Sequence, residues 1–256
     1  MSARRAAAVL AGAVLVSGLG VATVAARPSG RISSAAPVVQ SMVVGSSGAI
    51  LSQARTVTAS ATTVRVGGRS CAVAAGTPLA VLAAISRAGG PGFALRDYGH
   101  CGGAEANSGQ LFVYSLGGET NRGQNGWEYK VDGVSGSTGA ADTSGPSGNG
   151  RPLGSGAQVL WFWCAAYRGG CQRTLAVSGA ASVRRGGSLS VTVTGRDNEG
   201  RGAPVAGAIV TLGSDFASTA TNGRATLYAP TTPGRYQLSA TRRGLVPSFP
   251  ETIVAR

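Results

Sequence analysis

The stretch GWEYKVDG, at residues 126–133, says more about the fold class than any other part of the sequence. Its apolar and polar residues alternate as they do in a β-strand, and it ends in Asp132-Gly133, a dipeptide typical of tight hairpin turns. A second aromatic run, VLWFWC at residues 159–164, follows later in the chain. The two runs predict two aromatic strands in a chain where aromatic residues make up only 5%.

Side chains that are two apart in a strand share one face, so neighbouring strands would collect their aromatic rings on a common face. The candidate ligand-binding residues are the aromatic ones on that face: Trp127, Tyr129, Trp161 and Trp163. One interpretation is a buried core, because large aromatics dominate burial energy where they are scarce. The other is an exposed stacking face for a sugar or a flat ligand, with the Gly/Ser-rich loop at residues 134–156 over it.

The N-terminus carries the pattern of an export signal. Arg4 and Arg5 form a positive region, residues 6–16 form an apolar core, and small residues precede a cleavage point after Ala26. Residues 1–26 are therefore predicted to be a signal peptide, and the protein to be secreted or associated with the cell surface. An uncleaved anchor is the alternative, because the weakly hydrophobic stretch at residues 6–26 is long enough to span a membrane.

The four cysteines agree with export, because none belongs to a Cys-x-x-Cys pair and an oxidising destination favours disulfides. Three pairings are possible. The sequence favours Cys71–Cys101, which would enclose a predicted helix, together with the local pair Cys164–Cys171. A metal site is the rival use of these residues. The wide spacing and the single histidine argue against it, so no metal is predicted.

Residues 27–54 are rich in Ser, Ala and Gly and are predicted to form a linker or an N-terminal arm. A helix is predicted over 76–90, with Thr77 as N-cap, Pro78 in its first turn and Gly89 at its end. Alternating apolar residues predict strands at 54–68, 93–99, 111–119, 126–133 and 157–167. One helix followed by strands predicts a small α+β domain over residues 55–172.

From Arg173 onward, short alternating segments are separated by turn sequences such as Thr-Asn-Gly and Thr-Thr-Pro-Gly. This spacing over residues 173–256 is typical of an antiparallel β-sandwich. The fold class predicted for the whole chain is therefore mainly β with one helix.

Two resemblances refine this prediction. The order GTPLAVLAAI, FVYSLGGE, NGWEYKVDG and GAQVLWFWC resembles the transcobalamin C-terminal-like domain of exported bacterial proteins, although Asp132 and Ala157 replace the Asn and Asp typical of that family. The resemblance implies a β-grasp-like sheet with one helix and a binding role outside the cell. It does not imply cobalamin binding, because the chain lacks the helical barrel that completes that site, and no cofactor is predicted. Residues 173–256 resemble the immunoglobulin-like or prealbumin-like repeats of bacterial surface proteins, which act in spacing or adhesion.

The net charge of +13 is spread along the chain, and its longest basic runs are pairs such as Arg184-Arg185. Such a surface favours anionic polymers by diffuse steering, or it is basic without specialisation. No nucleotide-binding motif occurs, and no nucleic acid is predicted as a partner. His100 is the only histidine and no nucleophile motif accompanies it, so no catalytic residue is predicted.

The sequence therefore predicts an exported, non-catalytic binding or adhesion protein. Its partner would be an unknown envelope or extracellular ligand, such as an anionic polymer or a glycan. A purely structural spacer is the alternative, and an enzyme acting on envelope carbohydrate is the third reading. No transmembrane segment is expected after cleavage of the signal.

Overall fold

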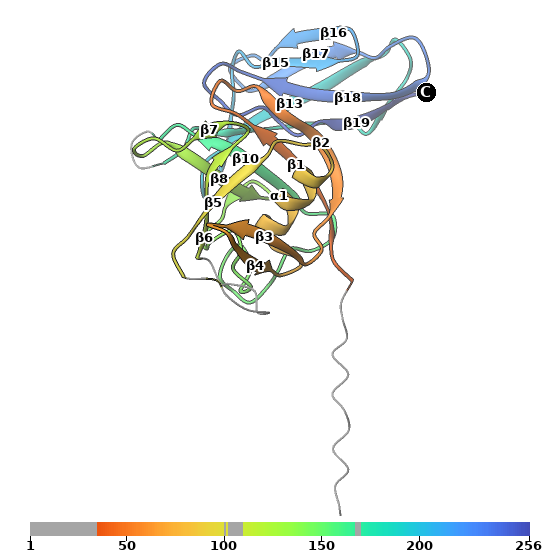
Figure 1. The fold of residues 1–256 in the computed structure, drawn as a ribbon. Helices are drawn as coiled ribbons and strands as arrows, with labels where there is room; N and C mark the ends of the chain where they lie inside the picture. The colour runs from red at the N-terminus through yellow and green to blue at the C-terminus, as the bar shows by residue number, and fades with distance from the viewer. Residues whose placement is uncertain (1–34, 100, 102–109, 167–169) are drawn as a thin grey trace, which may run out of the picture. The chain divides into compact units, whose positions relative to one another are not determined.

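The run VLWFWC forms the centre of a five-stranded sheet (Figure 1). The computed structural model describes residues 35–99, 101, 110–166 and 170–256. Strand β10 (Gln158–Cys164) lies between β1 (Val38–Val44), which is parallel to it, and β8 (Gly126–Val131), which is antiparallel. The sheet has the order β2-β1-β10-β8-β9 and is completed by β2 (Ile50–Thr58) and β9 (Val134–Ser135).

Strand β10 is buried on both faces, which explains its nearly unbroken apolar sequence. Trp161 and Trp163 pack in the main core, while Phe162 and Cys164 belong to a second cluster on the opposite face. The aromatic strands and their alternation are therefore as the sequence predicts.

The prediction of a linker or an N-terminal arm at residues 27–54 is wrong from Val38 onward. Strands β1 and β2 pair with each other there, and β1 occupies a central position in the sheet. Its residues Met42 and Val43 are fully buried. Small residues had suggested a linker, but partners distant in sequence supply the apolar surface that covers this short strand. The predicted signal peptide and residues 27–34 lie outside the described residues.

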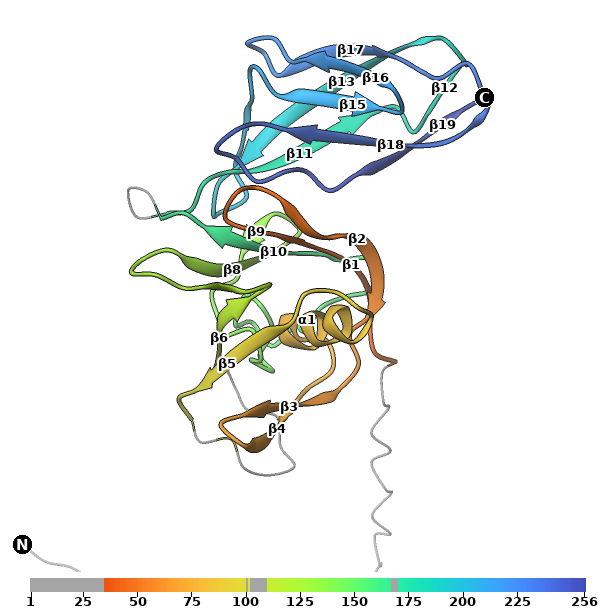
Figure 2. The ribbon, with the colours of Figure 1, turned by 45° about the horizontal axis from the view of Figure 1, so that its top comes forward.

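Helix α1 (Pro78–Arg87) packs on the inner face of the sheet, against β1, β2 and β10 (Figure 2). The Thr77 hydroxyl accepts a hydrogen bond from the Ala80 N–H at 3.2 Å and so caps the first turn, as predicted. Gly89 follows the last turn with a φ of 80°, which favours glycine. The buried helix residues are those of the predicted apolar face and their neighbours: Pro78, Leu79, Ala80, Val81, Leu82, Ala83 and Ile85.

Two smaller sheets complete this part of the chain. A hairpin is formed by β3 (Thr62–Val66) and β4 (Arg69–Val73), so residues 59–61 interrupt the single strand predicted over 54–68. A three-stranded sheet is formed by β5 (Phe93–Asp97), β6 (Leu111–Leu116) and β7 (Glu119–Thr120). Strands β5, β6, β8 and β10 lie within the four ranges predicted for them.

Residues 173–256 form two further sheets around their own core. The first contains β11 (Thr174–Gly179), β13 (Ser188–Arg196), β14 (Gly202–Pro204) and β17 (Arg224–Tyr228). The second contains β12 (Ser182–Val183), β15 (Ile209–Leu212), β16 (Asp215–Ser218), β18 (Gly234–Thr241) and β19 (Glu251–Ala255). In the described residues, no strand pairing crosses residue 173. The fold is therefore mainly β with a single described helix, as predicted.

Both predicted disulfides are present, Cys71–Cys101 with Cα atoms 5.3 Å apart and Cys164–Cys171 with Cα atoms 5.0 Å apart. Disulfides persist in oxidising compartments, so they favour a location outside the cytoplasm. Among the described residues, no helix has the length and apolar character needed to cross a membrane.

Candidate functional site

The four aromatic residues singled out by the sequence do come together, but inside the protein. Trp127, Tyr129, Trp161 and Trp163 are 4%, 5%, 1% and 8% exposed. Trp127 meets Trp163 edge to face with ring centroids 5.8 Å apart, and Tyr129 lies 5.5 Å from Trp161. These rings contribute to the core on the helix side of the sheet.

The loop after β9 covers this aromatic cluster. The Tyr129 hydroxyl donates to the Thr138 carbonyl at 2.9 Å, and a Cβ at Gly136 would lie 2.0 Å from the Tyr129 ring. Glycine is therefore required there for the loop to approach so closely. Of the two interpretations of these four residues, the buried core is therefore the one that the structure shows, and the exposed stacking face is not formed because residues 136–140 occupy its place.

An exposed aromatic face lies instead on β5 and β6. Tyr98, directly after β5, is 63% exposed and Phe112 of β6 is 43% exposed, with ring centroids 6.3 Å apart. Beside them, the Arg96 guanidinium lies 5.0 Å from the centre of the Tyr114 ring, a cation–π contact. We name Arg96, Tyr98, Phe112 and Tyr114 the β5–β6 aromatic face.

Alternation in the sequence LFVYSL produces this face. Leu111 and Val113 point into the core, so Phe112 and Tyr114 point away from it. Arg96 pairs with Phe112 across the two strands. The sequence reading missed the face because every residue from Leu111 to Tyr114 is apolar or aromatic and the pattern does not say which pair is buried. The arrangement offers flat rings and an exposed cation side by side.

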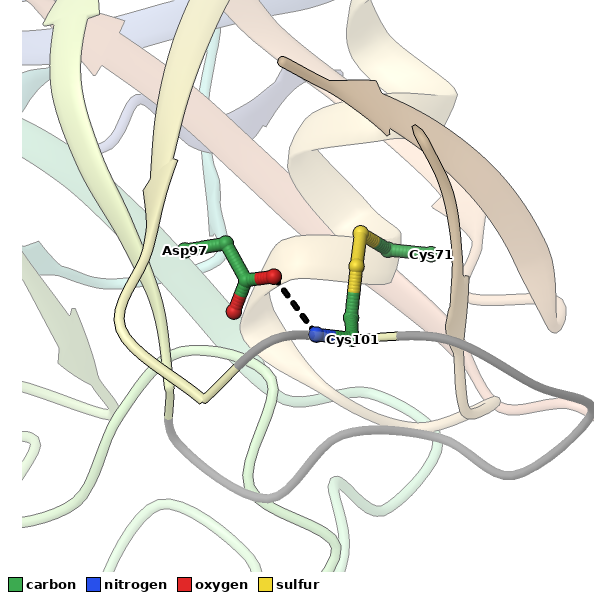
Figure 3. A group of neighbouring side chains, drawn as sticks. All are labelled: Cys71, Asp97 and Cys101. Carbon is green, nitrogen blue, oxygen red and sulfur yellow. Dashed lines mark hydrogen bonds between the residues drawn. A yellow bond between two sulfur atoms is a disulfide. The ribbon is translucent and has the colours of Figure 1, made fainter. Parts of the chain in front are cut away.

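Cys71, Asp97 and Cys101 lie close enough together to be considered as metal ligands (Figure 3). The sulfurs of Cys71 and Cys101 and a carboxylate oxygen of Asp97 lie within 4.8 Å of one another. The sulfurs are bonded to each other, however, and Asp97 accepts a hydrogen bond from the Cys101 N–H and lies 3.8 Å from Arg69. The carboxylate therefore holds the chain beside the disulfide. His100 lies outside the described residues.

Glu128 is the carboxylate nearest in sequence to the aromatic cluster. Glu128 precedes Tyr129 in β8, so its side chain points to the opposite face of the sheet from the aromatic cluster. Burial raises the pKa of the Glu128 carboxyl, and burial is also the main cause that raises the pKa of the Tyr129 hydroxyl.

Lys130 is the only lysine of the chain, and its side chain is buried. Residues 35–256 form one compact unit, and Lys130 lies where residues 35–172 contact residues 173–256. The Lys130 ammonium donates to the Asp197 carbonyl at 2.6 Å, and to the Arg196 carbonyl and the Thr174 hydroxyl at 3.3 Å each. It also lies 5.8 Å from the centre of the Phe162 ring. All three ammonium protons are used, so Lys130 joins the two parts of the chain.

Burial lowers the pKa of the Lys130 ammonium to about 8. The unfolded chain therefore binds this proton more strongly than the folded protein between about pH 8 and 10.5, and stability rises with pH across that window. Denaturant titrations of the wild type and of Lys130→Met at several pH values measure this effect. Above pH 8, the free energy of unfolding of the wild type is expected to rise relative to that of Lys130→Met. A difference between the two proteins that stays constant, or that changes in the opposite direction, contradicts the lowered pKa of Lys130.

Comparison with protein families, with curated proteins and with solved structures finds no match to this chain. The candidate site therefore stands on the geometry of its own residues.

Proposed function

We propose that this chain is an exported, non-catalytic protein that binds an acidic glycan through the β5–β6 aromatic face. The observation that carries the proposal is the exposure of Tyr98 and Phe112 beside the guanidinium of Arg96. Large rings are usually buried, and a group of exposed rings on one sheet face is typical of a binding surface.

The chemistry of the face fits such a ligand. Aromatic rings give a sugar flat apolar contact at a low cost in side-chain entropy, as they do in other binding surfaces. An exposed guanidinium binds a carboxylate by paired hydrogen bonds and charge. The net charge, which is +13 for the whole chain and stays strongly positive without Arg4 and Arg5 of the predicted signal peptide, adds a long-range attraction for an anionic polymer.

The proposal includes a finer description of the fold. Residues 55–172 form a β-grasp-like domain, which also includes strands β1 and β2, and helix α1 covers one face of its sheet. Residues 173–256 are an immunoglobulin-like sandwich. Support comes from the helix packing against the five-stranded sheet and from the two sheets that share one core.

Affinity chromatography and titration calorimetry of the full chain with an acidic oligosaccharide, oligogalacturonate, test the function. The double variant Tyr98→Ala/Phe112→Ala is expected to bind about 100-fold more weakly, because the loss of two stacking rings removes a few kcal/mol. A matched control is Phe216→Ala/Tyr228→Ala, which removes two rings that are 70% and 61% exposed on other strands. Equal affinity of the wild type and the β5–β6 variant, or a larger loss in the control, would sink the proposal.

A structural spacer is the second candidate, and two observations favour it. All three tryptophans are buried, and Lys130 fixes residues 35–172 to residues 173–256 through buried hydrogen bonds. A spacer has no need of exposed rings, so it predicts that neither alanine variant changes binding to any glycan.

A further inference from the structure

A surface groove is lined by two turns that are distant in sequence. One is the turn between β1 and β2, at residues 44–48, and the other follows β18, at residues 241–247. The volume of the groove is about 830 Å³, within the range of small-molecule sites. No residue of the β5–β6 aromatic face belongs to its lining. The groove is therefore a separate candidate for ligand binding.

Two consecutive arginines, Arg242 and Arg243, line the groove and are exposed. They are the first two residues of a tight turn, in which the Leu245 N–H donates to the Arg242 carbonyl at 3.1 Å. Gly244 has a φ of 78°, as the third residue of a type II turn requires. The Arg242 guanidinium also donates to the Ala206 carbonyl. The turn and this hydrogen bond fix the cationic side of the groove.

The charge of these two arginines is not compensated locally. Neither guanidinium forms an ion pair within the part of the chain that the structure describes, and the described residues that line the groove include no Asp or Glu. Glu119 accepts a hydrogen bond from the Ser46 N–H at 2.7 Å, but it does not line the groove. A concave surface with charges of one sign concentrates ions of the opposite sign. The groove therefore favours an anionic group.

The turn between β1 and β2 adds neutral hydrogen-bond donors. Ser46 and Ser47 are both exposed there. The Ser47 hydroxyl oxygen accepts a hydrogen bond from the Ala49 N–H at 3.3 Å, which leaves its O–H free to donate. A carboxylate accepts hydrogen bonds in one plane and fits a single guanidinium, whereas a phosphate or sulfate ester has three free oxygens that point in different directions. Donors on two separate turns therefore fit a tetrahedral oxyanion better than a planar one.

We propose that this groove binds the phosphate or sulfate group of a polyol or sugar. The guanidiniums of Arg242 and Arg243 bind its oxygens by charge-assisted hydrogen bonds, and the hydroxyls of Ser46 and Ser47 donate to the oxygen that points toward the other turn. The carbon skeleton of the ligand contacts Ile209, which is 42% exposed. None of the described residues that line the groove is aromatic, so a nucleic acid finds no ring on which a base could stack. This inference goes beyond the acidic-glycan site and does not depend on it.

Amide chemical-shift titration of the full chain with three matched ligands tests the inference. Glycerol 1-phosphate, glycerol 1-sulfate and glycerate share a three-carbon polyol and carry no ring that could stack on the aromatic face. At about pH 5 each of them has close to one negative charge, so that only the shape of the anion differs. The amides of Ser46, Ser47, Arg242 and Arg243 are expected to shift, and the tighter ester should bind at least about threefold more tightly than glycerate. The tighter of the two esters identifies the natural group as phosphate or as sulfate.

The double variant Arg242→Gln/Arg243→Gln is expected to bind the tighter ester at least about tenfold more weakly, because charge-assisted hydrogen bonds are lost. Arg184→Gln/Arg185→Gln is the matched control, since it removes the same two charges from an exposed pair that does not line the groove. Its effect should stay below about twofold, because salt screens charges that do not touch the ligand. Equal losses in the two variants would reduce the effect to diffuse charge and overturn the inference.

Two further variants test the place and the shape of the site. Ser46→Ala keeps both arginines and should weaken binding of the esters while leaving that of glycerate unchanged. Tyr98→Ala/Phe112→Ala alters only the aromatic face and should bind the esters as the wild type does. Glycerate that binds as tightly as both esters, a loss of ester binding in Tyr98→Ala/Phe112→Ala, or the absence of shifts in both turns overturns the inference. None of these results bears on the binding of oligogalacturonate, which tests the proposed function separately.

Discussion

Replacing Trp127 with alanine is expected to lower the free energy of unfolding by about 3–5 kcal/mol, the usual cost of deleting a buried aromatic side chain. The ring is 4% exposed and packs edge to face on Trp163 at 5.8 Å. Its loss also leaves the Glu119 carbonyl without the indole donor that now lies 2.9 Å away. The cavity left by the ring and the lost hydrogen bond both lower the free energy of unfolding.

Urea denaturation followed by fluorescence measures this effect, because all three tryptophans of the chain lie between Gly126 and Cys164 and report on the same sheet. Tyr228→Ala is the control, since that ring is 61% exposed and its removal should change stability by less than about 0.5 kcal/mol. A loss below about 1 kcal/mol for Trp127→Ala would mean that the aromatic cluster is not part of the core and would restore it as a ligand face.

Removing the disulfide Cys71–Cys101 is expected to cost about 3.5 kcal/mol on the loop-closure account of disulfide stability. The bridge closes a sequence separation of 30 residues that contains helix α1, and it ties β4 to the segment after β5. Removing the bridge raises the conformational entropy of the unfolded chain more than that of the folded protein, which lowers stability. The double variant Cys71→Ala/Cys101→Ala in urea denaturation gives the measurement.

The second disulfide provides the comparison. Cys164–Cys171 closes a separation of only 7 residues, so Cys164→Ala/Cys171→Ala should cost about 2.5 kcal/mol, less than the first pair. A larger loss for the short loop than for the long one would show that strain or packing, and not loop closure, sets the contribution of these bridges.

Local chemistry made several elements predictable from the sequence. Thr77, Pro78 and Gly89 fix the ends of helix α1 within the neighbouring residues, and they do so regardless of the rest of the fold. The dipeptide Asp132-Gly133 forms the turn between β8 and β9, with φ values of 51° and 86°. Each of these signals acts within a few residues, so it survives without knowledge of the tertiary structure.

Other features depend on partners far away in the sequence. Strand β1 looks like a linker because its pairing with β10 joins residues about 118 positions apart, and no local signal announces it. The burial of Trp161 depends on the loop at residues 136–140, and the exposure of Phe112 depends on which side of β6 meets the core. Long-range packing therefore decides which aromatic residues face solvent, and the sequence alone left a buried core and an exposed face open for Trp127, Tyr129, Trp161 and Trp163.

Amide chemical-shift mapping of the full chain, titrated with oligogalacturonate, is the most direct test of the proposed binding face. The largest shifts are predicted in β5 (Phe93–Asp97), at Tyr98 directly after it, and in β6 (Leu111–Leu116). Residues of β16 and β17, which carry the exposed rings of Phe216 and Tyr228, should not move. Shifts centred on β16 and β17, or no shifts at all with a ligand in large excess, would contradict binding at the β5–β6 aromatic face.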